Sequence, residues 1–132
     1  MSQASANAFG SNSPLIFMDV NTMHTIAYVM RRKPGLTQEE FFTLYLEHGQ
    51  VMAALARGLL SYEQFPLRHA DSLGDIYSIP GEAPYDAISI YTYATAEDAN
   101  YTSLLPGVIT DSEKFIDFET MIAMPVQKRT VV

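Results

Sequence analysis

The sequence predicts one α+β domain whose strands and helices follow the order β-α-β-β-α-β. Three observations predict it: segments in which side chains alternate between two faces, two segments that begin with helix-capping residues, and turn residues between them. The chain has 132 residues, about one ordinary domain and too few for two. This order is that of the ferredoxin-like sandwich, a four-stranded antiparallel sheet with its helices on one side.

The first strand and the first helix have the strongest signals. Residues 22–33 alternate as a strand with apolar residues on both faces, and a Lys-Pro-Gly turn ends it. A helix begins at Thr37, because Thr37 and Glu40 have the spacing of a capping box. It runs to about Arg57, where Gly58 can end it. The side chains predicted on its packed stripe are Phe41, Tyr45, His48, Met52 and Leu55.

The remaining elements follow from the same signals. They are strands at 59–68, 85–93 and 119–126, a second helix from Thr95 to about Leu105, and a turn or short helix at 112–118. Pro66 indicates that its strand lies at a sheet edge or contains a bulge, because proline cannot donate to the ladder. Pro106 and Gly107 are expected to break the second helix.

Two segments predict little regular structure. Residues 1–20 are mostly small and polar, and we expect a flexible N-terminal tail ahead of a single domain at 21–132. Within it, the apolar residues 15–18 either dock on the domain or a second subunit, or are weakly held. Residues 71–84 are rich in Gly, Pro, Ser and acidic side chains, which predicts a long loop of the kind that forms binding elements or lids.

Composition excludes several classes of function. Lys and Arg total 8 and Asp and Glu total 15, a net charge of −7, which argues against nucleic-acid binding. No apolar run approaches the roughly 20 residues of a membrane span, and the start lacks the features of a signal peptide. The absence of Cys excludes disulfides and thiolate chemistry. We therefore expect a soluble, cytoplasmic protein without nucleic-acid or membrane partners.

Apolar residues on both faces of several strands predict an interface. Helices on one side of the sheet would cover one face and leave the other open. An open apolar face of this size usually marks a contact surface. The simplest closure is a two-fold homodimer that pairs the open faces.

Three histidines are the first candidates for chemistry. His48 lies on the packed stripe of the long helix. It is either a core histidine with a satisfied ring, which periodicity alone favours, or a cavity-lining imidazole that takes and returns a proton near pH 7. His24 could face the same space from the first strand. His69 adjoins the long loop and is most simply solvated.

Other side chains could assist such chemistry. Asp86 opens the third strand, where it either binds backbone N–H groups or orients His48 or a substrate hydroxyl. The basic run at 31–33 is a solvated strand end or an attraction for an anionic substrate. Neither metal-binding His spacing nor a phosphate-binding glycine loop is present, so we expect no metal and no cofactor. The phenols that could donate to a substrate, or be ordinary half-buried aromatics, are Tyr28, Tyr45, Tyr62 and Tyr91.

Four segments together resemble the EthD-like family of dimeric α+β barrel proteins. Residues 32–41 resemble the family's opening signature, a Lys-Pro-Gly turn followed by a capped helix and a Phe. Residues 45–49, Tyr-Leu-Glu-His-Gly, resemble its helix motif. Residues 85–88 and 111–117 add weaker matches to its third strand and to its acidic segment, so the likeness spans about residues 22–126.

The resemblance implies a ferredoxin-like βαββαβ sandwich that forms a dimeric α+β barrel, with a cavity between helix and sheet in each subunit. It implies that His48 is the family's helix histidine and Asp86 its strand aspartate. It also implies an activity, because small stand-alone members include cofactor-free lyases of fungal aromatic polyketide pathways. These enzymes decarboxylate phenolic intermediates, or dehydrate and cyclise them.

The function we expect is therefore a cofactor-independent lyase of aromatic polyketide biosynthesis, with His48 as general acid/base and Asp86 or a tyrosine to orient it. A non-catalytic polyketide-binding accessory protein and a cofactor-free oxygenase are the alternatives. The first would use His48 only structurally, and the second would consume oxygen. The residues expected to bind the substrate are Tyr28, Tyr45, Met52, Tyr62 and His24.

Overall fold

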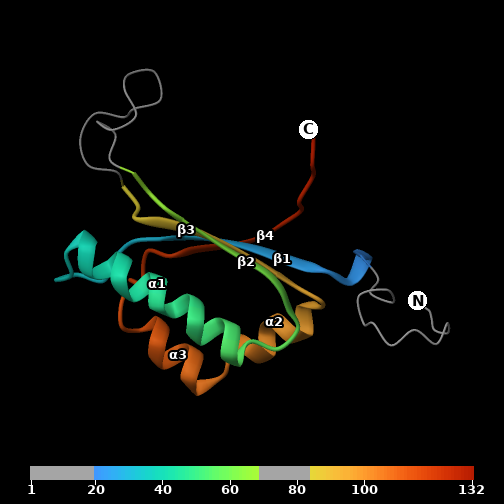
Figure 1. The fold of residues 1–132 in the computed structure, drawn as a ribbon, viewed down its shortest axis with the longest axis horizontal. Helices are drawn as coiled ribbons and strands as arrows, with labels where there is room; N and C mark the ends of the chain where they lie inside the picture. The colour runs from blue at the N-terminus through green and yellow to red at the C-terminus, as the bar shows by residue number, and fades with distance from the viewer. Residues whose placement is uncertain (1–19, 69–83) are drawn as a thin grey trace.

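A computed structural model describes residues 20–68 and 84–132 and shows three helices on one side of a single sheet (Figure 1). The elements, in chain order, are a 3-10 turn at Val20–Thr22, β1 (His24–Met30), α1 (Gln38–Leu55), β2 (Leu59–Pro66), β3 (Ala87–Tyr93), α2 (Ala96–Ser103), α3 (Pro106–Ser112) and β4 (Ile122–Val126). Residues 1–19 of the predicted tail, including its apolar residues 15–18, lie outside the described residues, as do His69 and most of the predicted loop at 71–84.

The sheet has the strand order β2-β3-β1-β4, and all its pairs are antiparallel. The two edge strands, β2 and β4, contain the prolines Pro66 and Pro125, which a sheet tolerates at its edges. A register irregularity between Leu59 and Ser61 also marks β2. The predicted ferredoxin-like α+β fold is confirmed, including the edge position that Pro66 indicated.

Among the described residues, α3 is the one α-helix that the sequence did not predict. Pro106 does end the preceding segment, but it is also the first residue of α3, with Leu105 as its N-cap. Proline is tolerated there because the N–H it lacks would have no partner within the helix. Residues 113–115 form a turn, which is one of the two outcomes predicted for 112–118.

α1 begins as predicted. The Glu40 N–H donates to the Thr37 hydroxyl over 3.1 Å, and the Thr37 N–H donates to the Glu40 carboxylate over 2.8 Å. The predicted stripe is buried at Phe41, Tyr45, His48 and Met52. The prediction is wrong for Leu55, which is 43% exposed, because the helix ends there and its side chain lies against the start of α3 at Gly107. Gly58, at φ +68°, turns the chain into β2.

The core lies between the helices and the sheet, and the opposite face of the sheet has no helix among the described residues (Figure 1). Side chains alternate between the two faces of each strand, and the strand pairing places eight apolar side chains together on this open face. They are Ala27, Val29, Phe65, Ile88, Ile90, Ile122, Met124 and Val126. Separately, none of the helices in the described part of the chain is both long and apolar enough to span a membrane.

Candidate active site

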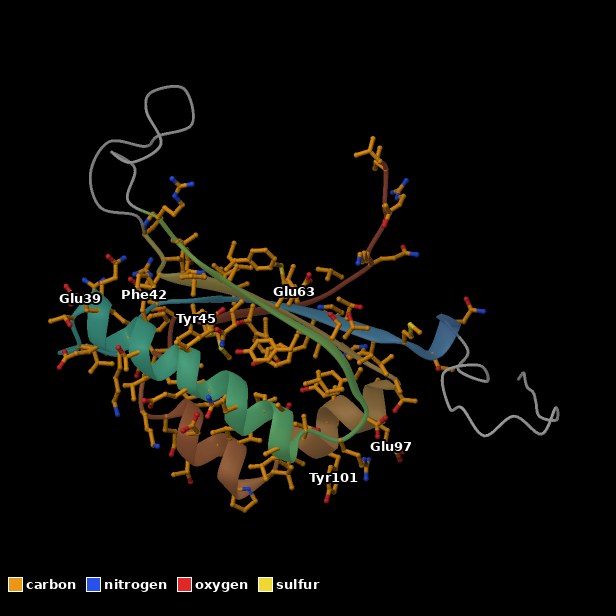
Figure 2. The ribbon with its side chains drawn as sticks, viewed as in Figure 1. Glu39, Phe42, Tyr45, Glu63, Glu97 and Tyr101 are labelled. Atoms are coloured by element: carbon orange, nitrogen blue, oxygen red, sulfur yellow. The ribbon has the colours of Figure 1, made fainter. Side chains whose placement is uncertain are left out.

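A cavity of about 360 Å³ lies between α1 and the helix-facing side of the sheet. β1, β3 and all three helices contribute to its wall, together with the chain that leads from α3 to β4. Most of the lining is aromatic or aliphatic, and Figure 2 shows side chains between α1 and the sheet, Tyr45 among them. The size and the apolar lining are those of a small-molecule site.

His48 lines this cavity from the middle of α1 and is 4% exposed. Its Nδ1 lies 2.6 Å from Oδ2 of Asp111, and its ring meets Phe115 edge-on at 5.3 Å between centroids. An ionised carboxylate can only accept, so Nδ1–H donates and fixes the tautomer. Nε2 is left with its lone pair and without a hydrogen bond to any described residue. The ring is therefore prepared to accept a proton at Nε2.

Asp111 is held by two donors. Besides His48, the Lys114 ammonium lies 3.1 Å from Oδ1 of Asp111. Burial raises the pKa of Asp111, but the hydrogen bonds from His48 and Lys114 outweigh this effect, and the pKa falls below its usual value. Burial lowers the pKa of His48 by more than Asp111 raises it. A neutral imidazole thus pairs with an ionised carboxylate near neutral pH.

The tyrosines of the cavity remain protonated at neutral pH. Burial raises the pKa of Tyr45 to about 12, and the Tyr45 hydroxyl lies 2.7 Å from the Ser89 hydroxyl and 2.9 Å from the Ile88 carbonyl. Burial likewise raises the pKa values of Tyr28, Tyr91 and Tyr93. These phenols do not act as bases, and the hydroxyl hydrogen of Tyr45 is already donated to the Ile88 carbonyl.

The structure brings together four of the seven predicted site residues. His48, Tyr28, Tyr45 and Met52 all line the cavity. Tyr62 stands behind the wall, stacked on Tyr91 with ring centroids 4.1 Å apart. His24 opens β1 opposite Tyr93 and, like Tyr62, is not part of the cavity lining among the described residues.

Asp86 does not meet His48. Its carboxylate accepts from the backbone N–H and the guanidinium of Arg32, each over 2.8 Å, at the start of β3. This is the backbone-binding arrangement that the sequence offered as the alternative to a catalytic role. The carboxylate that orients the imidazole comes from α3 instead, at Asp111.

Asp111 and the polar groups of α2 and α3 are the site residues that the sequence did not identify. Asp111 is the first residue of segment 111–117, which resembles the acidic segment of the family, but the sequence did not predict a role for its side chain. Val108, Asp111 and Ser112 are the buried residues of α3, and they have the i, i+3, i+4 spacing of one helix face. With Pro106 as the first helical residue, this spacing was the signal that could have found the helix and its inward carboxylate.

No set of three or more His, Cys, Asp or Glu side chains within residues 20–68 and 84–132 is grouped as a metal ion would need. The polar residues that line the cavity instead supply an imidazole, phenols, aliphatic hydroxyls and one carboxylate, that of Glu113. The fold and the cavity define a ferredoxin-like domain with a buried histidine–carboxylate pair facing a ligand-sized space.

The EthD domain family matches residues 33–119, which is more than half of the chain. The protein therefore belongs to the EthD family. No curated protein sequence matches the chain.

Solved structures share the fold at low sequence identity. SnoaB from Streptomyces nogalater, described as a cofactor-independent oxygenase, is 10% identical, with a TM-score of 0.58 over 84% of this chain and 97% of that one. A putative antibiotic biosynthesis monooxygenase from Bacteroides thetaiotaomicron is 13% identical, with a TM-score of 0.58 over 82% and 90%. A dimeric protein of unknown function from Bacteroides fragilis is 9% identical, with a TM-score of 0.56 over 80% and 96%.

Proposed function

We propose that this protein is a cofactor-independent lyase of secondary metabolism that acts on a phenolic aromatic polyketide by general acid/base catalysis. The observation that carries the proposal is the His48 ring, neutral and fixed by Asp111, with its Nε2 unoccupied in a cavity of ligand size. Membership of the EthD family supports it. The reaction is a decarboxylation, or a dehydration coupled to cyclisation.

For dehydration and cyclisation, Nε2 of His48 removes a proton from the carbon beside a carbonyl. The resulting enolate carbon forms a bond to a second carbonyl carbon, and the imidazolium protonates the oxygen of that carbonyl. Nε2 then removes the second proton from the nucleophilic carbon, and the imidazolium gives this proton to the new hydroxyl as the C–O bond breaks, the C=C bond forms and water leaves. Asp111 stabilises the imidazolium each time it forms, because its carboxylate lies 2.6 Å from Nδ1.

The phenols of the cavity position the substrate in this proposal. Tyr28 presents a protonated hydroxyl, which can donate to a carbonyl oxygen of a polyketone. Tyr45 donates its hydroxyl hydrogen to the Ile88 carbonyl and contributes its ring to the cavity wall. Met52 lies against the aromatic cluster that contains Tyr91 and can pack on the face of a flat ring. Asp86 has a structural part here, because it fixes Arg32, two residues after the end of β1.

The alternative of a cofactor-free oxygenase is favoured by one observation, the shared fold with SnoaB. Turnover in air and under nitrogen separates the two, with phenolic polyketones that carry a methylene group beside a carbonyl as substrates. We expect equal rates in both atmospheres and a product lighter by one water or one carbon dioxide, as measured by mass spectrometry. Turnover that stops under nitrogen and consumes oxygen in air would replace the lyase with the oxygenase.

We also propose that the open face of the sheet is the interface of a homodimer. Its side chains include Phe65, Ile122, Met124 and Val126, each between 38% and 45% exposed. An apolar patch across all four strands is larger than scattered surface residues explain. The Bacteroides fragilis protein of the same fold is described as dimeric, which supports a second copy as the partner.

Ile90→Lys is expected to convert this dimer to a monomer. Ile90 lies on the open face, between Ala27 and Glu63 on the neighbouring strands, so a lysine there would place a charge inside the interface. The mass is measured by light scattering after size-exclusion chromatography. Ala53→Lys on the exposed side of α1 adds the same charge and should remain dimeric. A monomeric wild-type protein at micromolar concentration would contradict the interface.

A further inference from the structure

We propose that the cavity binds its substrate in an uncharged form, and that Glu113 at the cavity mouth is the residue that excludes anions. This inference rests on the lyase function proposed for the same site and deepens it. It names the substrate class as flat, hydroxylated aromatic ketones without a carboxylate. It thereby assigns dehydration and cyclisation, rather than decarboxylation, to the enzyme.

The positive charges of the chain all lie outside the cavity wall. The sequence has 8 Lys and Arg, every one of them in the described ranges, and none lines the cavity. The two that lie beside Glu113 have other partners. Lys114 binds the Asp111 carboxylate, and the Lys33 ammonium donates to the backbone carbonyl of Glu113 over 3.1 Å. A substrate carboxylate would therefore find no cation among the lining residues.

The cavity wall instead offers neutral donors and one negative group. Its neutral polar atoms come from the imidazole, the phenols and four hydroxyls, while Glu113 lines the cavity and is exposed to solvent. An anion that enters this space leaves its water shell without gaining an opposite charge, which is costly in a mostly apolar site. A phenol or ketone loses less hydration and can use the hydroxyl donors.

The position of Glu113 makes it the selective element. It is two residues after Asp111, at the end of α3, so its backbone is fixed by the same helix that orients His48. Because Glu113 is both exposed and part of the lining, it stands where the cavity meets solvent. Its negative charge repels an approaching carboxylate and leaves an uncharged ring unaffected.

Two probes of similar shape test this selectivity in the wild-type protein. 2-Naphthol is an uncharged, flat phenol at neutral pH, and 3-hydroxy-2-naphthoic acid is the same ring system with a carboxylate. We expect 2-naphthol to bind at least about tenfold more tightly by isothermal titration calorimetry, because only the acid leaves a buried charge unpaired. Competition between 2-naphthol and the polyketone substrate locates the binding in the cavity.

Glu113→Gln removes the negative charge, so we expect the acid to bind more tightly. The ratio of the affinities for 2-naphthol and for the acid should then fall about threefold or more. Glu113→Lys should lower this ratio further, because it adds a positive charge. The matched control is Glu119→Gln, which changes the net charge equally at a carboxylate outside the cavity lining. It should leave the ratio as it is. A ratio that moves equally in Glu113→Gln and Glu119→Gln would overturn the role of Glu113.

The remaining outcomes separate this inference from the proposed function. If the acid binds as tightly as 2-naphthol or more tightly, the preference for an uncharged substrate is wrong, while the role of His48 is unaffected. If neither probe binds, the inference is wrong, and if the polyketone does not bind either, the small-molecule site fails as well.

Discussion

His48→Gln is expected to lower kcat/KM by about 10²- to 10⁴-fold, the usual contribution of a positioned general acid/base. Glutamine is close in size to histidine and can still donate to Asp111, so the packing against Phe115 is largely retained. It cannot take up a proton at neutral pH. The loss is measured as product formed per folded molecule, with circular dichroism and thermal unfolding to show that the variant folds.

Gln50→Ala is the matched control, because Gln50 lies on the exposed side of the same helix and should keep wild-type turnover. A folded His48→Gln variant with wild-type turnover would remove His48 from the mechanism. If instead His48→Ala lowers the stability of the fold while bound polyketide is released unchanged by both variants and wild type, the protein is a binding protein with a structural histidine.

The placement of His48 could be predicted because it depends on local signals alone. The capping box at Thr37 and Glu40 fixes where α1 begins, and the 3.6-residue period then fixes which side chains share a face. The same reasoning holds for β3, where alternation buries Ala87, Ser89, Tyr91 and Tyr93 toward the helices. These features involve residues only a few positions apart.

The partner of His48 could not be predicted in this way. Asp111 is 63 residues from His48, and their meeting depends on how α3 packs on α1. A local sequence pattern does not determine which two helices pack against each other. The helix α3 was also not predicted, because Pro106 indicated a helix break, whereas it is the first residue of α3. Asp86 was the carboxylate that the sequence offered as the partner of His48. Its carboxylate instead accepts hydrogen bonds from the backbone N–H and the guanidinium of Arg32.

Asp111→Asn is expected to reduce kcat and to move the acid limb of the kcat/KM profile to lower pH. The limb reflects protonation of His48, whose neutral form is the base. Asp111 raises the pKa of His48 through its hydrogen bond and its charge, while burial lowers it. Removing the charge leaves the effect of burial, so the pKa falls further. kcat falls because the imidazolium loses the carboxylate that stabilises it during the reaction.

The direction of this shift distinguishes a positioning role from a structural one. A variant that merely loosens α3 would lower stability and turnover and leave the acid limb in place. NMR titration of the three histidines provides a second readout, in which only the His48 signal should move to lower pH. Asp117→Asn is the control, because Asp117 accepts from Thr120 over 2.9 Å and lies outside the cavity lining. An acid limb that stays fixed, or moves to higher pH, would show that Asp111 does not set the basicity of His48.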